Sequence, residues 1–509
     1  MDYKGKIPPY YIMRKTFLFL FALALAGHAV AQVDSDEYQK QLQRMREQYA
    51  QQRDKARQQY DAARSKAEAD YAAFRKKANA DYAEAVQRAW QQMGVQPAVP
   101  KPAEPKPPQP AKPDPAKTPT TKPLPQAETV PPPVVKPAVP TPAIPAAVPE
   151  APTMQFEMYG AACSVHTDIS GLRFSLPSVD EQSVAAAWQQ LSQERYNGLL
   201  HDCLAERDAL GLADWGYLQL LGNMSERLLG KGSNEAVLLQ MYLLAQSGYR
   251  VRMARVDTRL VLLMPFNRTV YGYSYLTSDG INHYLITREK IKSVEVCSVA
   301  FPREQVANIL MSRMPDLGDG KRRSRTVQAE RFGTMKATVS VDERLMDFLR
   351  DYPLSDAWDY YALAGLSDSV KSTLYPALRS QLAGMSNKKA ALMLLDFVQT
   401  GFDYATDQDQ FGYERPLFGD ESFFYPKNDC EDRSILYCIL VRDLLGLDVV
   451  LVNWPGHIAT AVAFPEAVEG DYFTIDGRRY TICDPTYIGA NVGMTMPQFQ
   501  GVGAKLIKL

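Results

Sequence analysis

Apolar residues recur every eleven positions along the first polar segment of the chain. The repeat consists of five tyrosines, each followed seven residues later by a smaller apolar residue: Tyr38, Tyr49, Tyr60, Tyr71 and Tyr82, then Met45, Ala56, Ala67, Ala78 and Ala89. Eleven residues fill three helical turns at about 3.67 residues per turn, a period typical of a straight or right-handed coiled coil. The pattern predicts a long coiled-coil helix over residues 32–95.

The apolar stripe of this helix is narrow, because Arg, Gln, Lys and Glu occupy its other faces. Such a stripe cannot form a core alone, so we expect a homo-oligomer to form through residues 35–92. A solitary charged helix or a partly disordered arm is the alternative interpretation.

The composition changes abruptly over residues 96–154, which contain more than half of the 35 prolines of the chain. Pro, Ala, Lys, Val and Thr in no regular order cannot bury a core, and they favour an extended, polyproline-like chain. We therefore predict a disordered linker over this segment.

Helical and strand-like patterns alternate from residue 156 to the end, which predicts an α+β fold with domains at 155–325 and 326–509. The two halves share an order of parts: a helix, a glycine stop, two strands, an Asp-Gly turn and a further strand. Matching Asn234 with Cys430 places Arg259 near His457 and Arg288 near Asp484. The first domain then looks like a copy without reactive groups, unless two mixed domains resemble each other by coincidence.

The beginning of the chain has the pattern of an export signal, so residues 1–31 are predicted to be a signal peptide. A basic end at residues 13–15 precedes an apolar run at residues 17–26, and small residues at 29–31 suit cleavage before Gln32. The apolar run is about half of the ~20 residues that a membrane-spanning helix needs. We expect an exported protein that is periplasmic, cell-surface or secreted, with no transmembrane helix in the mature chain. Either Met1 or Met13 could be the start.

The net charge of −1 argues against a general nucleic-acid binder. No His, Cys or carboxylate cluster has zinc-like spacing, so no metal and no cofactor is expected. Among the six cysteines, Cys430 and Cys438 lie eight apart on one predicted helix, about 12 Å of rise and too far to bridge. With Cys430 a candidate free nucleophile, we expect one disulfide at most.

Three short motifs in the last domain carry groups that a cysteine nucleophile needs. They are Asn428-Asp429-Cys430-Glu431-Asp432, Pro455-Gly456-His457 and Cys483-Asp484-Pro485-Thr486. A thiol at a helix N-terminus lies near unpaired N–H groups that favour an anion, although neighbouring carboxylates oppose it. His457 is the only histidine of this domain and would activate the thiol. Asp484 would orient the imidazole ring.

This assignment requires a particular strand pairing. His457 begins a predicted strand and Asp484 follows another, so they meet only if these two strands are antiparallel neighbours. We predict direct pairing, with residues 465–477 as a long connection. The alternative is structural: Cys430 as a buried small residue, and His457 and Asp484 as turn residues.

The three motifs resemble those of the transglutaminase-like superfamily of papain-like cysteine enzymes. The resemblance covers roughly residues 385–490 and, more weakly, residues 210–290. It implies two transglutaminase-like (papain-like) domains and a catalytic Cys430–His457–Asp484 triad in the second. The family often has a second oxyanion donor shortly upstream of the cysteine, for which Tyr425 is the candidate. No feature matches the calcium dependence of the animal enzymes.

The resemblance further implies acyl transfer, in which Cys430 attacks an amide of a protein or peptide substrate and the acyl group passes to water or an amine. A cysteine hydrolase or peptidase is favoured over a crosslinking enzyme. The alternative function is a non-catalytic cell-envelope scaffold or peptide-binding module, because the first domain lacks the triad.

Overall fold

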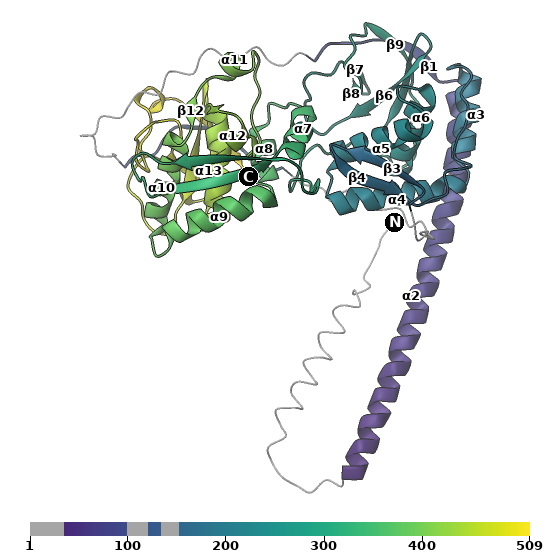
Figure 1. The fold of residues 1–509 in the computed structure, drawn as a ribbon, viewed down its shortest axis with the longest axis horizontal. Coiled ribbons are helices and arrows are strands. Elements are labelled where there is room, and N and C mark those ends of the chain that lie inside the picture. The colour runs from purple at the N-terminus through teal and green to yellow at the C-terminus, as the bar shows by residue number, and fades with distance from the viewer. Residues whose placement is uncertain (1–34, 99–120, 134–151) are drawn as a thin grey trace. The chain divides into compact units, whose positions relative to one another are not determined.

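The computed structural model describes residues 35–98, 121–133 and 152–509 (Figure 1). The predicted signal peptide and the remaining parts of the proline-rich segment lie outside these residues. The chain separates into two units, residues 1–73 and residues 74–509, and the boundary falls within the first helix. No helix in the described ranges is long and apolar enough to cross a membrane.

The predicted long helix is present as α2 (Ser35–Val86), but it ends earlier than expected. Residues 90–94, predicted to lie in the coil, form strand β1 (Trp90–Gly94), because they pair with a free strand edge in the first half. The tyrosine stripe has two environments. Tyr49 and Tyr60 are 63% and 67% exposed, whereas Tyr82 is buried, with its ring centroid 4.5 Å from that of Trp188.

The first half combines helices with a six-stranded sheet, and α6 packs on β6. Its elements are a hairpin of β3 (Met154–Met158) and β4 (Ala161–Val165), helices α3 (Glu181–Leu191), α4 (Arg195–Leu210), α5 (Asp214–Leu229) and α6 (Asn234–Gln246), and strands β5 (Arg252–Val256), β6 (Arg259–Pro265), β7 (Tyr275–Ser278), β8 (Ile281–Leu285) and β9 (Ser293–Cys297).

The second half begins with the predicted hairpin, β10 (Arg322–Gln328) and β11 (Lys336–Asp342). Its helices are α7 (Glu343–Asp351), α8 (Trp358–Ala364), α9 (Asp368–Leu382), α10 (Asn387–Thr400), α11 (Asp407–Gln410), α12 (Glu421–Phe424), α13 (Cys430–Leu445) and the 3-10 turn η1 (Pro497–Phe499). Its other strands are β12 (Asp403–Tyr404), β13 (Lys427–Asn428), β14 (Asp448–Trp454), β15 (His457–Ala463), β16 (Tyr472–Ile475), β17 (Arg478–Cys483) and β18 (Ala504–Lys508).

The two large sheets have the same strand order. The first runs β7-β8-β6-β5-β9-β1, and the second runs β16-β17-β15-β14-β18-β2. In each half one helix, α6 or α13, directly precedes the central hairpin, and this hairpin has a two-residue turn in both halves. The shared order agrees with the repeated pattern read from the sequence.

The prediction of a disordered linker is wrong for residues 121–130. Strand β2 (Gln126–Val130) pairs in parallel with β18, and Leu124 is buried among apolar residues of the second sheet. Prolines at 123, 125 and 131 flank this strand rather than interrupt it. A proline lacks a backbone N–H but keeps its carbonyl, so the residues of β2 can still pair with the open edge of β18. The segment therefore belongs to the second half, although it precedes the first in sequence.

Candidate active site

Helix α13 positions Cys430 at its first turn. Asp429 is the N-cap, and its side chain accepts a hydrogen bond from the backbone N–H of Asp432, whose own side chain accepts one from the N–H of Asp429. The helix ends at Gly446, whose φ of 65° is a left-handed conformation that suits glycine. The helix packs on β14 and β15, which fixes the thiol beside the sheet.

The predicted pairing of the histidine and aspartate strands is confirmed. β15 and β17 are antiparallel neighbours with Thr460 opposite Cys483, so the start of one lies near the end of the other. His457 Nε2 is 2.9 Å from Asp484 Oδ2, and both side chains are buried. The other oxygen of Asp484 accepts hydrogen bonds from the backbone N–H groups of Thr486 and Tyr487. These bonds fix the carboxylate and, through it, the imidazole.

An aromatic stack that the sequence reasoning missed also holds the imidazole. The ring of Phe499 lies nearly parallel to that of His457, with centroids 5.0 Å apart, and Trp454 stacks on Phe499 at 5.1 Å. Trp454 is opposite His457 in the β14–β15 register. Phe499 comes from η1, more than forty residues further along the chain, so no local pattern indicates this contact.

The Cys430 thiol is buried, with 4% exposure, and lies close to the histidine strand. The backbone of Ile458, the residue after His457, hydrogen-bonds the thiol. The Sγ atom also donates a hydrogen bond to Glu431 Oε2 at 3.0 Å. Burial, and then the Asp429 carboxylate, raise the pKa of the Cys430 thiol above its ordinary value, although its hydrogen bonds lower it. The resting thiol is therefore protonated at neutral pH.

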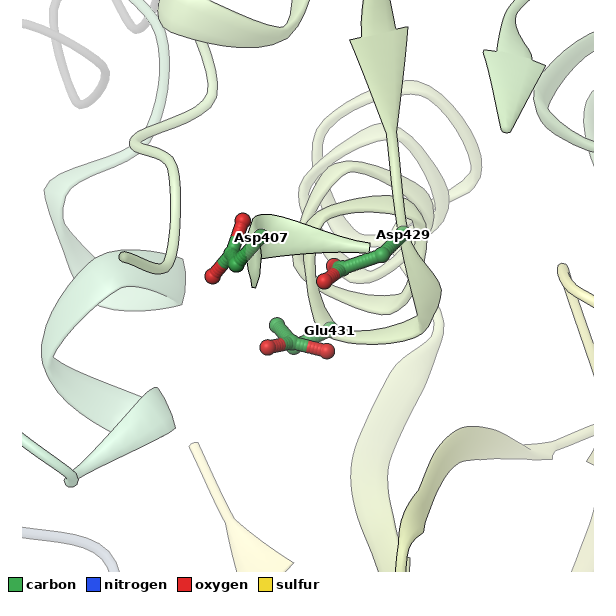
Figure 2. A group of neighbouring side chains, drawn as sticks. All are labelled: Asp407, Asp429 and Glu431. Carbon is green, nitrogen blue, oxygen red and sulfur yellow. The ribbon is translucent and has the colours of Figure 1, made fainter. Parts of the chain in front are cut away.

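Three carboxyl groups gather near the start of α13 (Figure 2), and one of them, Glu431, accepts the hydrogen bond of the thiol. Asp407, Asp429 and Glu431 are all buried, and each offers an oxygen within 4.8 Å of the others. Burial is the largest cause that raises the pKa of each group, and it brings that of Asp407 to about 7. Oxygen ligands at this spacing suit a hard cation, but a cluster alone assigns no metal.

Two polar residues to which the sequence motifs assigned no role lie beside the cluster. The short parallel pair β12–β13 places Tyr404 opposite Asn428, one residue before the N-cap. The Tyr404 hydroxyl is a buried atom without a hydrogen-bond partner among the described residues. Burial first, and then the charges of Cys430, Asp429 and Glu431, raise the pKa of this hydroxyl. The Asn428 amide is likewise buried and unpartnered within the described chain.

Tyr425, the predicted oxyanion donor, has a different environment from Tyr404. Its backbone N–H donates to the Glu421 carbonyl at 2.9 Å, and its ring contacts Phe411 and Phe424. Its carbonyl accepts a hydrogen bond from Arg325. The backbone donor of Tyr425 is thus already used, and its catalytic role stays a prediction.

The corresponding positions of the first half carry different chemistry. Asn234 begins α6 as Cys430 begins α13, and its amide bonds the backbone of Thr258 and Leu260. Arg259 begins β6 as His457 begins β15, and it forms an exposed ion pair with Glu289. The β6–β8 register places Thr287, rather than the expected Arg288, at the position of Asp484.

All six cysteines are free, which agrees with the prediction of at most one disulfide. Comparisons with protein-family models, with curated proteins and with solved structures found no match to this chain. The resemblance to transglutaminase-like enzymes therefore stays an interpretation of the three motifs.

Proposed function

We propose that the chain is an exported cysteine acyl-transfer enzyme of transglutaminase-like type, which hydrolyses or transamidates amide bonds in protein or peptide substrates. The observation that supports this most is the buried His457–Asp484 pair, 2.9 Å apart, beside a helix N-terminus that carries Cys430. A buried imidazole held by a carboxylate and an aromatic stack is typical of a positioned base.

In the proposed reaction His457 takes the thiol proton on Nδ1, because Nε2 faces Asp484. The thiolate then attacks the amide carbonyl carbon, and the imidazolium returns its proton to the nitrogen as the C–N bond breaks. Water or an amine next attacks the thioester and releases Cys430. The backbone N–H of Cys430 and the unpartnered hydroxyl of Tyr404 are the proposed oxyanion donors.

The alternative, a peptide-binding module without turnover, is supported by the resting thiol. Cys430 is buried and its raised pKa opposes nucleophilic attack at neutral pH. The first half moreover keeps the same sheet order without the three reactive groups. The two functions differ in whether His457 activates Cys430.

Alkylation of the folded chain by iodoacetamide, with each cysteine followed by mass spectrometry, tests the proposal. We expect Cys430 to react faster than Cys438, which lies on the same helix at 0% exposure. The His457→Ala variant should lose this difference, whereas a His283→Ala variant in the first half should keep it. Equal rates for Cys430 with and without His457 would favour the binding module.

A further inference from the structure

One segment joins the two edges of the second sheet. We call residues 121–130 the strap. Its residues 122 and 124 exchange backbone hydrogen bonds with Tyr472 of the edge strand β16, and its β2 portion pairs with β18 at the opposite edge. The sheet is therefore curled far enough that ten residues span its opening. The space between the strands β16 and β18, which we call the seam, is occupied by this strap.

The first sheet has an equivalent closure. β1 pairs with β9, and Gln96 exchanges backbone hydrogen bonds with Tyr275 of β7. There the closing segment directly follows α2, so its origin is fixed by a short connection. The strap of the second sheet is different, because long segments separate it from both neighbours along the chain.

The strap is held as a bound peptide is held. Most of its side chains are exposed, and Leu124 is its one buried side chain. Three side-chain contacts add to the backbone ladder: Lys122 Nζ lies 2.9 Å from Gln500 Oε1, the N–H of Gly470 donates to Thr121 Oγ1 at 3.1 Å, and Lys505 Nζ of β18 lies 3.6 Å from Glu128 Oε2. A strand ladder with one anchoring side chain is how extended peptides add to a sheet edge.

The covalent connections do not determine whether the strap closes the second sheet of its own chain or that of another copy. Residues 99–120 precede it and residues 134–151 follow it, and at roughly 3.4 Å per residue they span at most about 75 Å and about 60 Å. The contacts made by the strap are the same whether it belongs to its own chain or to another. Exchange of an identical element between copies is thus a low-cost route to a dimer.

We propose that the seam is a docking site for the strap of a second copy of this chain, so that two chains close each other's second sheets. The partner's Leu124 would then enter the apolar cluster that contains Trp454 and Phe499, which stack beside His457. Each candidate active site would be completed by the other chain. The proposal concerns assembly, and it stands whether or not Cys430 is a nucleophile.

A cysteine pair across β2 and β18 tests the exchange in the full chain. Glu128 and Lys505 are paired in the register, and both side chains are largely exposed, at 62% and 45%, so their replacement leaves the core intact. One copy carries Glu128→Cys and one affinity tag, and the other carries Lys505→Cys and a second tag. The two are co-expressed, so that pairing is decided during folding, and then oxidised.

The expected result is a disulfide-linked species that carries both tags. Its matched control replaces Lys505→Cys by Arg478→Cys, an exposed position on β17, and should give no such species. A single chain with both Glu128→Cys and Lys505→Cys tests the register itself. The proposal is overturned if this double variant forms its disulfide within one chain while the co-expressed pair forms none. Failure of the double variant to form any disulfide would also overturn it, because the strap would then not lie on β18.

Discussion

The carboxyl cluster beside Cys430 should make the stability of the folded chain fall as pH rises. Burial first, and then the charge of Glu414, raise the pKa of Asp407 from 3.8 to about 7, although the Arg415 backbone N–H bonds its carboxylate. A carboxyl with a higher pKa in the folded state than in the unfolded state binds its proton more tightly when folded. Its stabilising effect is present below about pH 4 and is lost as pH rises through 7.

The size of this effect follows from the shift in pKa. A shift of about three pKa units corresponds to about 4 kcal/mol, of which about 3 kcal/mol is lost between pH 5 and pH 8. Repulsion is of similar size, because two charges 4.8 Å apart interact by about 3.5 kcal/mol at an effective dielectric constant of about 20. The raised pKa values of Asp429 and Glu431 act in the same direction.

The Asp407→Asn variant isolates this contribution. Asparagine still accepts the backbone hydrogen bond from Arg415 but cannot ionise. We expect the free energy of unfolding of the wild-type chain, from urea denaturation with a chelator present, to fall between pH 5 and pH 8. The fall should be smaller by about 2–3 kcal/mol in the variant. An Asp409→Asn change, at an exposed site on the same helix, is the matched control.

Two results would refute this reasoning. Wild-type stability that is flat or rises from pH 5 to pH 8 would show that the cluster does not hold extra protons in the folded state. An equal fall in the Asp407→Asn variant and in the wild type would show that another group causes the pH dependence.

Three further predictions concern single side chains. Tyr404→Phe should change the free energy of unfolding by no more than about 1 kcal/mol, because the hydroxyl that it removes has no partner among the described residues. The same change should slow acyl-enzyme formation about 10²-fold, and an unchanged single-turnover rate would exclude Tyr404 as an oxyanion donor. Leu124→Ala removes the one buried anchor of the strap, so cleavage after Glu128 by a glutamate-specific protease should become faster with little loss of helical circular dichroism; unchanged cleavage would show that the backbone ladder alone holds the strap. Tyr49→Lys with Tyr60→Lys should lower the sedimentation coefficient of the full chain if these exposed residues pair two copies of α2, and an unchanged value would leave α2 without a role in assembly.

Local signals predicted the parts of the site that lie close together in sequence. Asp429 as a cap and Gly446 as a stop define α13, and both act within one turn of the helix. Direct pairing of β15 with β17 was predictable because a shared role for His457 and Asp484 requires it. These inferences needed only the chemistry of caps, turns and strands.

The missed parts depend on contacts between distant segments. Tyr404 and Asp407 lie in what the sequence shows as an aromatic, charged loop, and they reach Cys430 only because β12 pairs with β13. Phe499 reaches His457 from η1, and the strap lies in a segment whose composition indicates disorder. The open edge of β18 decides the conformation of the strap, and that edge is formed about 380 residues later in the sequence.

The acidic neighbours of Cys430 lead to a prediction about how the reactivity of its thiol depends on pH. The Asp429 carboxylate raises the pKa of the thiol, and asparagine at this position would still cap α13. The removal of one nearby like charge lowers a pKa by about one to three units, and each unit increases the thiolate fraction about tenfold below the pKa. The Asp429→Asn chain should therefore be alkylated at Cys430 at least about tenfold faster at pH 9. The difference between the two chains should shrink as pH falls, because burial raises the pKa of Asp429 and its charge is lost on protonation. A gain in rate that stays the same as pH falls would show that Asp429 remains ionised over that range, and an unchanged or slower rate at pH 9 would show that its charge does not restrain the thiol.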